Sequence, residues 1–143
     1  MEITNIGSQT VKSGDNVLFT SVRVPGNCST IFQAGSGLVT LRALSNGQCR
    51  ARFRVKFTGN LKADASEEIS GVTLLSLAVA KSGEAILPAT MIVTVGDTTS
   101  TYNVNTEVLI DVPTCCCQTI SIKNTSDITV DVVDANLIVE RVA

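Results

Sequence analysis

The sequence has 143 residues, a formal net charge of −2, 44 % hydrophobic residues and 17 % charged residues. This length suffices for one domain with its own core, and the composition excludes a disordered tail and a polybasic nucleic-acid binder. The chain lacks histidine, which excludes catalytic systems with an imidazole base and most catalytic zinc sites. We therefore expect a single non-enzymatic domain over residues 1–143, with no cofactor, metal or nucleic acid.

The chain also lacks the long uncharged apolar stretch that a membrane helix needs. Its first residues, Met1 to Asn5, have neither the basic nor the apolar region of a signal peptide. We therefore expect no membrane partner and synthesis in the cytoplasm of the producing cell.

Valine, threonine and serine are abundant, and segments that alternate apolar and polar residues are separated by turns rich in glycine, asparagine and proline. This pattern predicts an antiparallel β-sandwich or jelly roll. Residues 1–10 are expected to form an arm or an edge strand, and residues 60–69 a surface loop. The predicted strands cover residues 16–24, 38–44, 48–57, 72–81, 86–95, 102–112, 119–124 and 128–142.

Segments 38–44 and 48–57 are predicted to pair as a hairpin around Ser45-Asn46-Gly47. A three-residue loop with Gly47 in the left-handed conformation pairs Leu41 with Ala51 and gathers the apolar side chains on one face. The opposite face then carries a basic row, which is either a solvated surface or a candidate external contact for an acidic neighbour, a subunit or an anionic glycan. The basic row consists of Arg42, Arg50, Arg52, Arg54 and Lys56.

The five cysteines are an odd number and include the run Cys115, Cys116 and Cys117. Because we expect no export signal, we expect free thiols. Successive side chains on a strand alternate between its faces, so three adjacent thiols cannot converge on one metal ion. Two interpretations stay open: small apolar residues that fill a tight strand entry, which we favour, or subunit-interface thiols that pack or cross-link near a threefold axis.

Several segments resemble a known family: residues 14–19 (GDNVLF), 51–60 (ARFRVKFTGN), 77–84 (LAVAKSGE), 120–126 (ISIKNTS) and 135–142 (ANLIVERV). From about Val11 onward, the chain is similar to the jelly roll shared by tumour necrosis factor and the globular heads of complement and short-chain collagens, in the compact form of bacteriophage and Firmicute surface proteins. The resemblance implies an all-β, two-sheet antiparallel jelly-roll sandwich of about ten strands. It also implies a homotrimer whose inner sheets meet around the threefold axis.

The sequence departs from the animal members of this family, because aliphatic residues mostly replace their aromatic trimer core, and we expect no collagen or coiled-coil stalk before the domain. We therefore expect a virion structural protein of a bacteriophage, a trimeric capsid decoration or head-fibre component. It would assemble with other virion structural proteins in the host cytoplasm.

Two alternatives belong to other classes. The first is a carbohydrate- or receptor-binding tip of a tail or cell-surface appendage, in which the basic row contacts a host-surface glycan. The second is an enzyme that uses carboxylates alone, such as a glycosidase, which needs two acids about 5 to 9.5 Å apart. The acidic residues are scattered, and the sequence places no such pair.

Overall fold

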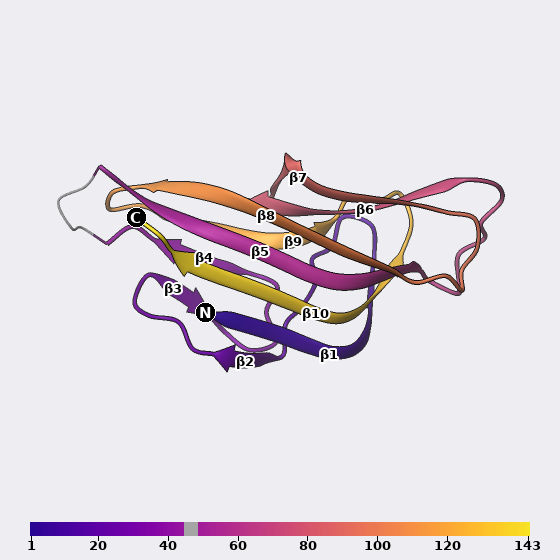
Figure 1. Ribbon diagram of the computed structural model, residues 1–143, viewed down its shortest axis with the longest axis horizontal. Helices are drawn as coiled ribbons and strands as arrows, with labels where there is room; N and C mark the ends of the chain where they lie inside the picture. The colour runs from indigo at the N-terminus through magenta and orange to yellow at the C-terminus, as the bar shows by residue number, and fades with distance from the viewer. Residues whose placement is uncertain (45–48) are drawn as a thin grey trace.

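The computed structural model describes residues 1–44 and 49–143, which form a sandwich of two antiparallel five-stranded sheets (Figure 1). The first sheet has the order β2-β1-β10-β5-β8 and the second the order β3-β4-β9-β6-β7. This arrangement confirms the predicted all-β jelly roll. In chain order the strands are β1 (Glu2–Val11), β2 (Ser21–Val24), β3 (Thr30–Phe32), β4 (Val39–Arg42), β5 (Arg50–Ala63), β6 (Thr73–Lys81), β7 (Glu84–Val95), β8 (Tyr102–Pro113), β9 (Cys117–Asn124) and β10 (Val130–Arg141).

The described residues contain no helix, and so none that is long and apolar enough to span a membrane.

The core lies between the two sheets and is built by alternation. On β5, Phe53, Val55 and Phe57 are fully buried, while the residues between them face away from the core. Phe19 also lies fully buried, and the rest of the core is almost entirely aliphatic. Burying one such side chain contributes about 1.5 to 3 kcal/mol, so the regular alternation fixes which face of each strand turns inward.

The predicted hairpin between residues 38–44 and 48–57 is wrong. β4 pairs with β3 and β9 in the second sheet, whereas β5 pairs with β10 and β8 in the first. Leu41 therefore faces Thr30 and Gln118 across the sheet, and Ala51 faces Val112. The predicted loop Ser45-Asn46-Gly47 lies outside the described residues, between strands of opposite sheets.

Four further features differ from those predicted. Residues 2–11 form β1, which lies between β2 and β10 and is therefore neither an arm nor an edge strand. In the expected strand 16–24, only Ser21–Val24 belongs to a sheet as β2, while Asn16 makes an isolated bridge to Lys123. β5 continues to Ala63 into the expected surface loop, and the short β3 was not predicted.

Two bulges interrupt the first sheet on either side of β10, one where β1 pairs with β10 and one where β10 pairs with β5. The register shifts between Asn5 and Ser8 on β1 and between Val133 and Asn136 on β10. Gly7 has a φ of 89° and donates its amide to Asp134 Oδ1 at 2.8 Å, while Asp134 itself has a φ of 52°. The left-handed backbone at Gly7 favours glycine there because this residue has no Cβ.

Both chain termini lie at the same end of the sandwich, which we call the terminal end (Figure 1). The amino group of Met1 donates to Val139 O at 2.8 Å, and the amide of Val142 donates to Arg52 O at 2.8 Å. The start of β5 and the turn from β8 to β9 lie at this same end. Strands of both sheets therefore begin or end here.

Candidate functional site

Four members of the basic row lie on the free face of the first sheet. On β5, Arg50, Arg52, Arg54 and Lys56 alternate with buried residues and turn away from the core. Arg42 does not join them: it lies on β4 in the second sheet, opposite Cys117. The predicted row of five residues is corrected to a row of four, because β4 and β5 are not neighbours.

Carboxylates on the neighbouring strands β8 and β10 pair with these arginines. Arg52 makes a two-pronged contact with Asp111, with distances of 2.7 Å and 2.9 Å, and Arg50 lies 3.3 Å from the same carboxylate. Arg54 Nε donates to Glu140 at 2.7 Å, and a second nitrogen of its guanidinium lies 3.9 Å from Glu107. The free face is therefore a ladder of mixed charge across β10, β5 and β8 instead of a purely basic surface.

Asp111 is the centre of this charge ladder. Its hydrogen bonds from Arg52 lower the pKa of its carboxyl group, and the nearby charges of Arg50 and Lys81 lower it further. The same contact raises the pKa of Arg52. Both groups thus stay charged over a wide pH range, which favours a persistent ion pair.

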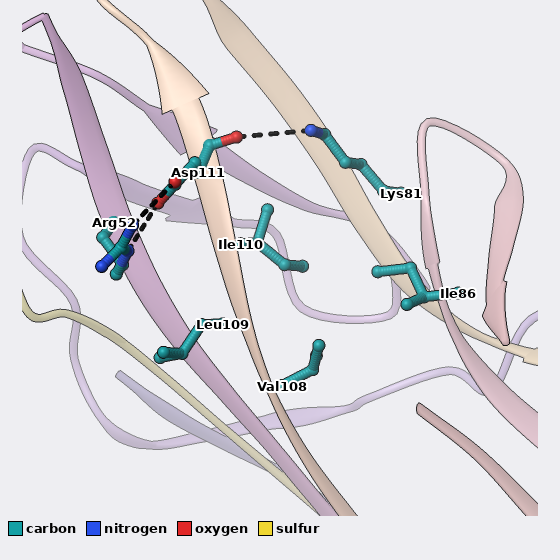
Figure 2. Close-up of a pocket in the computed structure, with 7 residues that line it drawn as sticks. All are labelled: Arg52, Lys81, Ile86, Val108, Leu109, Ile110 and Asp111. Carbon is teal, nitrogen blue, oxygen red and sulfur yellow. Dashed lines mark hydrogen bonds and ion pairs between the residues drawn. The ribbon is translucent and has the colours of Figure 1, made fainter. Parts of the chain in front are cut away.

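A groove of about 440 Å³ opens beside Asp111, where the edge strand β8 of the first sheet approaches β6 and β7 of the second (Figure 2). Lys81 reaches across it and donates to the backbone oxygen of Asp111 at 3.3 Å. Figure 2 shows Arg52 on the opposite side of β8, bound to the Asp111 carboxylate. The other lining residues are apolar: Ile86, Val108, Leu109 and Ile110.

The edge around this groove exposes large apolar side chains. Leu109 on β8 is 56 % exposed and Leu87 on β7 is 82 % exposed. β7 and β8 each pair with only one strand, so their outer backbone groups have no partner within their sheets. Pro88 lies on β7, as is common for an edge strand. Leu109 lines the groove, and Leu87 follows the lining residue Ile86 on β7. We call Leu87, Leu109 and this groove the apolar edge.

A pair of carboxylates that sequence analysis missed lies toward the other end of β5. Asp131 accepts a hydrogen bond from Thr10 Oγ1 at 3.1 Å, and the carboxyl group of Asp64 interacts with it. Burial raises the pKa of Asp131, and its contact with Asp64 adds to this, whereas the amide of Ser66 lowers the pKa of Asp64. The sequence gives no signal for this pair because Asp64 and Asp131 are far apart along the chain.

This pair does not share a site with Asp111. Asp131 lies opposite Lys62 in the sheet, ten residues along β5 from Arg52, which corresponds to roughly 30 Å. Within residues 1–44 and 49–143, no three cysteine or acidic side chains are arranged to hold a metal ion.

All five cysteines are exposed. Cys115 and Cys116 lie in the turn between β8 and β9, and Cys117 is the first residue of β9. The favoured interpretation of this run as small apolar residues that fill a strand entry is therefore wrong. The side chains escape burial because the alternating strand pattern stops at Pro113, the last residue of β8.

Comparison with known proteins gives the fold and no closer relationship. No protein-family model and no curated protein matches the sequence. Among solved structures, the globular domain of the zebrafish complement 1qA protein matches with a TM-score of 0.62 at 10 % sequence identity, covering 96 % of this chain and 93 % of that one.

An isomalto-dextranase of Arthrobacter globiformis T6 complexed with panose also aligns, at 10 % identity, over 92 % of this chain and 23 % of that chain. Its TM-score of 0.28 supports no inference. The match to the complement domain spans nearly the whole of both chains and includes both sheets. The chain therefore has the tumour necrosis factor-like jelly-roll fold of the complement globular heads.

Proposed function

We propose that this protein is a non-enzymatic structural component of a bacteriophage virion, a capsid decoration or head-fibre protein that works as a homotrimer. The observation that carries the proposal is the apolar edge, where Leu87 and Leu109 are exposed beside an apolar groove and two unpaired strand edges. A fold of the complement globular-head type supports a threefold assembly.

The proposed contact places the apolar edge of one subunit against the first sheet of the next. Such a contact joins two different surfaces, and with a threefold rotation it closes into a ring. The free face of the first sheet carries mostly the charge ladder, and Leu109 lies opposite Arg54 on this same face. Leu109 and Leu87 supply the apolar part of the contact. Three copies would then present any weak external contact three times, which increases avidity.

The charge ladder favours this structural role over a tip that binds anionic glycans. Arg50, Arg52 and Arg54 already pair with carboxylates of the same chain. An anionic ligand would have to compete with these ion pairs. The arginines instead connect β5 to its two neighbours in the sheet, β10 and the edge strand β8.

Light scattering on the eluted chromatography peak tests the trimer. We expect three times the mass of one chain for the native protein, and one chain for the double variant Leu87→Glu/Leu109→Glu. Ile92→Glu is the matched control, because Ile92 is 63 % exposed on the same strand but lies six residues from Ile86, the β7 residue that lines the groove, whereas Leu87 is next to Ile86. This variant should stay trimeric. A monomeric native protein at micromolar concentration would contradict the proposal.

A second experiment tests the virion. Mass spectrometry of purified particles should detect the protein at a fixed ratio to the major capsid protein. The protein should also bind particles that lack it, and the monomeric double variant should bind more weakly because avidity is lost. Absence of the chain from purified particles would refute the virion role and leave the trimer untouched.

A further inference from the structure

The five cysteines belong to three separate segments: the loop between β2 and β3, the residue directly before β5, and the turn between β8 and β9 with the first residue of β9. All three segments lie at the terminal end (Figure 1). Backbone hydrogen bonds connect these parts. Ser29, next to Cys28, accepts from the amide of Arg42 at 2.8 Å, and Ala43 donates to Cys116 O at 3.2 Å. Across the same end, the amide of Thr114 donates to Cys49 O at 3.1 Å.

The position of these cysteines is unusual. Free cysteine is among the most buried residue types in proteins, yet the apolar core contains none. Packing therefore does not explain their place. In the described part of the chain, no three cysteine or acidic groups are arranged to hold a metal ion, so a preformed metal site does not explain it either. What remains is the covalent chemistry of exposed thiols.

The turn between β8 and β9 presents three of these thiols from an anchored backbone. Cys115 has a φ of 63°, and its amide donates to Ala43 O at 3.2 Å. The amide of Cys116 donates to Pro113 O at 3.1 Å, which closes the turn. Each of the three side chains is exposed, so each thiol is accessible to a group from outside.

We propose that Cys115, Cys116 and Cys117 form a covalent cross-linking site that joins copies of this chain through interchain disulfides. A thiolate of one copy attacks a disulfide oxidant such as oxidised glutathione, which forms a mixed disulfide and releases one glutathione. A thiolate of the second copy then attacks the mixed disulfide and releases the second glutathione. In total, two cysteine thiols are oxidised to one disulfide, and the glutathione disulfide is reduced to two thiols.

Two features favour a second copy of this chain as the partner. The number of cysteines is odd, so intrachain pairing always leaves at least one thiol over. In addition, every copy carries the same three adjacent thiols. One cysteine per chain would link only two of three subunits, whereas two different cysteines per chain can link all three into a closed ring. This ring rests on the proposed trimer, but the cross-link itself does not.

The test starts from the protein purified in reductant, whose mass is measured first by light scattering. It is then incubated with reduced and oxidised glutathione, and run on a denaturing gel without reductant. We expect covalent dimers and trimers that collapse to a single band when dithiothreitol is added. Mass spectrometry should identify linked peptides that contain residues 115–117.

Variants show whether this segment carries the cross-link. The triple variant Cys115→Ser/Cys116→Ser/Cys117→Ser should lose the covalent bands, while Cys28→Ser, which removes another exposed thiol of the same end, should keep them. Thermal unfolding in reductant verifies that both variants fold. Only glutathione adducts, only intrachain disulfides, or undiminished bands in the triple variant would each overturn the proposal.

The two proposals fail separately in this design. A reduced protein that is trimeric but gives no covalent bands would refute the cross-link alone. A reduced monomer that forms covalent dimers through residues 115–117 would refute the trimer and support the cross-link.

Discussion

The interior of the sandwich and its terminal end follow different rules. In the interior, each strand alternates between buried and exposed residues, and the buried positions hold valine, leucine, isoleucine, alanine and phenylalanine. At the terminal end the strands stop, and all five cysteines are exposed. The difference shows that burial constrains the choice of residue only where side chains face the core. Residues beyond the strands are free to carry reactive groups.

The largest expected effect comes from the interior. Phe53→Ala on β5 should lower the free energy of unfolding by about 3 to 5 kcal/mol, because it removes a fully buried ring and leaves a cavity. Urea unfolding followed by circular dichroism measures the change. The control Lys56→Ala lies on the exposed face of the same strand and should change the value by less than about 0.5 kcal/mol. Equal losses of stability in the two variants would contradict the inference that the buried face of β5 contributes more to stability than its exposed face.

Asn124 gives the next largest effect, because it is a polar residue with no exposed surface. Its amide nitrogen donates to Val11 O and Ile128 O, both at 3.0 Å, and its oxygen accepts from the Ser126 amide. Asn124→Ala leaves these backbone groups without their partner and should cost about 1 to 3 kcal/mol in the same urea experiment. Asn105→Ala, at an exposed position of β8, is the control. A neutral Asn124→Ala would mean that water replaces the lost contacts.

Alternation in the sequence predicted most strands and the direction of their side chains, but it could not predict their pairing. Leu41 and Phe53 both point into the core, as expected. They do so from opposite sheets, because an inward side chain fits a hairpin and a crossover between sheets equally well. The predicted hairpin failed for this reason. The ten-strand topology followed from the family resemblance and not from the pattern.

The candidate surfaces were predicted only in part, because the alternation shows which face of a strand a residue occupies but not which strands lie beside it. The basic residues of β5 occupy one face because they alternate with apolar residues on a single strand. Their partner Asp111 comes from a strand 59 residues away, and no local pattern signals such a pair. The exposure of Cys115 depends on the turn that follows β8. The pattern placed the end of this strand correctly at about residue 112, but it could not show whether the side chains of the turn are buried.

A smaller effect concerns the charge ladder. Hydrogen bonds from Arg52 lower the pKa of Asp111, so the ion pair stabilises the fold above the ordinary pKa of this carboxyl group, and the gain is lost as the pH falls through its lowered pKa. Arg52→Gln should move the titration of Asp111, followed by carboxyl NMR, toward its ordinary value. Arg23→Gln, which breaks a different ion pair with Glu2, should leave it unchanged. An unmoved Asp111 would show that other groups control its charge.

The smallest expected effect comes from the carboxylate pair Asp64 and Asp131. This pair lowers the stability of the fold at neutral pH, whereas the ion pair at Asp111 raises it. The pKa of Asp131 is raised by burial and by Asp64, so the native state binds an extra proton, and its stability falls as the pH rises from the ordinary pKa to the raised one. Asp131→Asn keeps an oxygen that can accept from Thr10 and removes the charge. At neutral pH the free energy of unfolding of the variant should therefore exceed that of the native protein by no more than about 0.5 kcal/mol after solvent screening, and its unfolding temperature should be slightly higher.

This gain should vanish in acid, where Asp131 is already protonated in the native protein. Thermal unfolding across the acidic pH range measures it, with Asp127→Asn, at an exposed position, as the control. If Asp131→Asn were instead less stable at neutral pH, the carboxylate would be held by a favourable contact. This result would exclude a raised pKa for Asp131. It would also contradict the conclusion that the charges near the two ends of β5 act oppositely, with attraction at Asp111 and repulsion at Asp131.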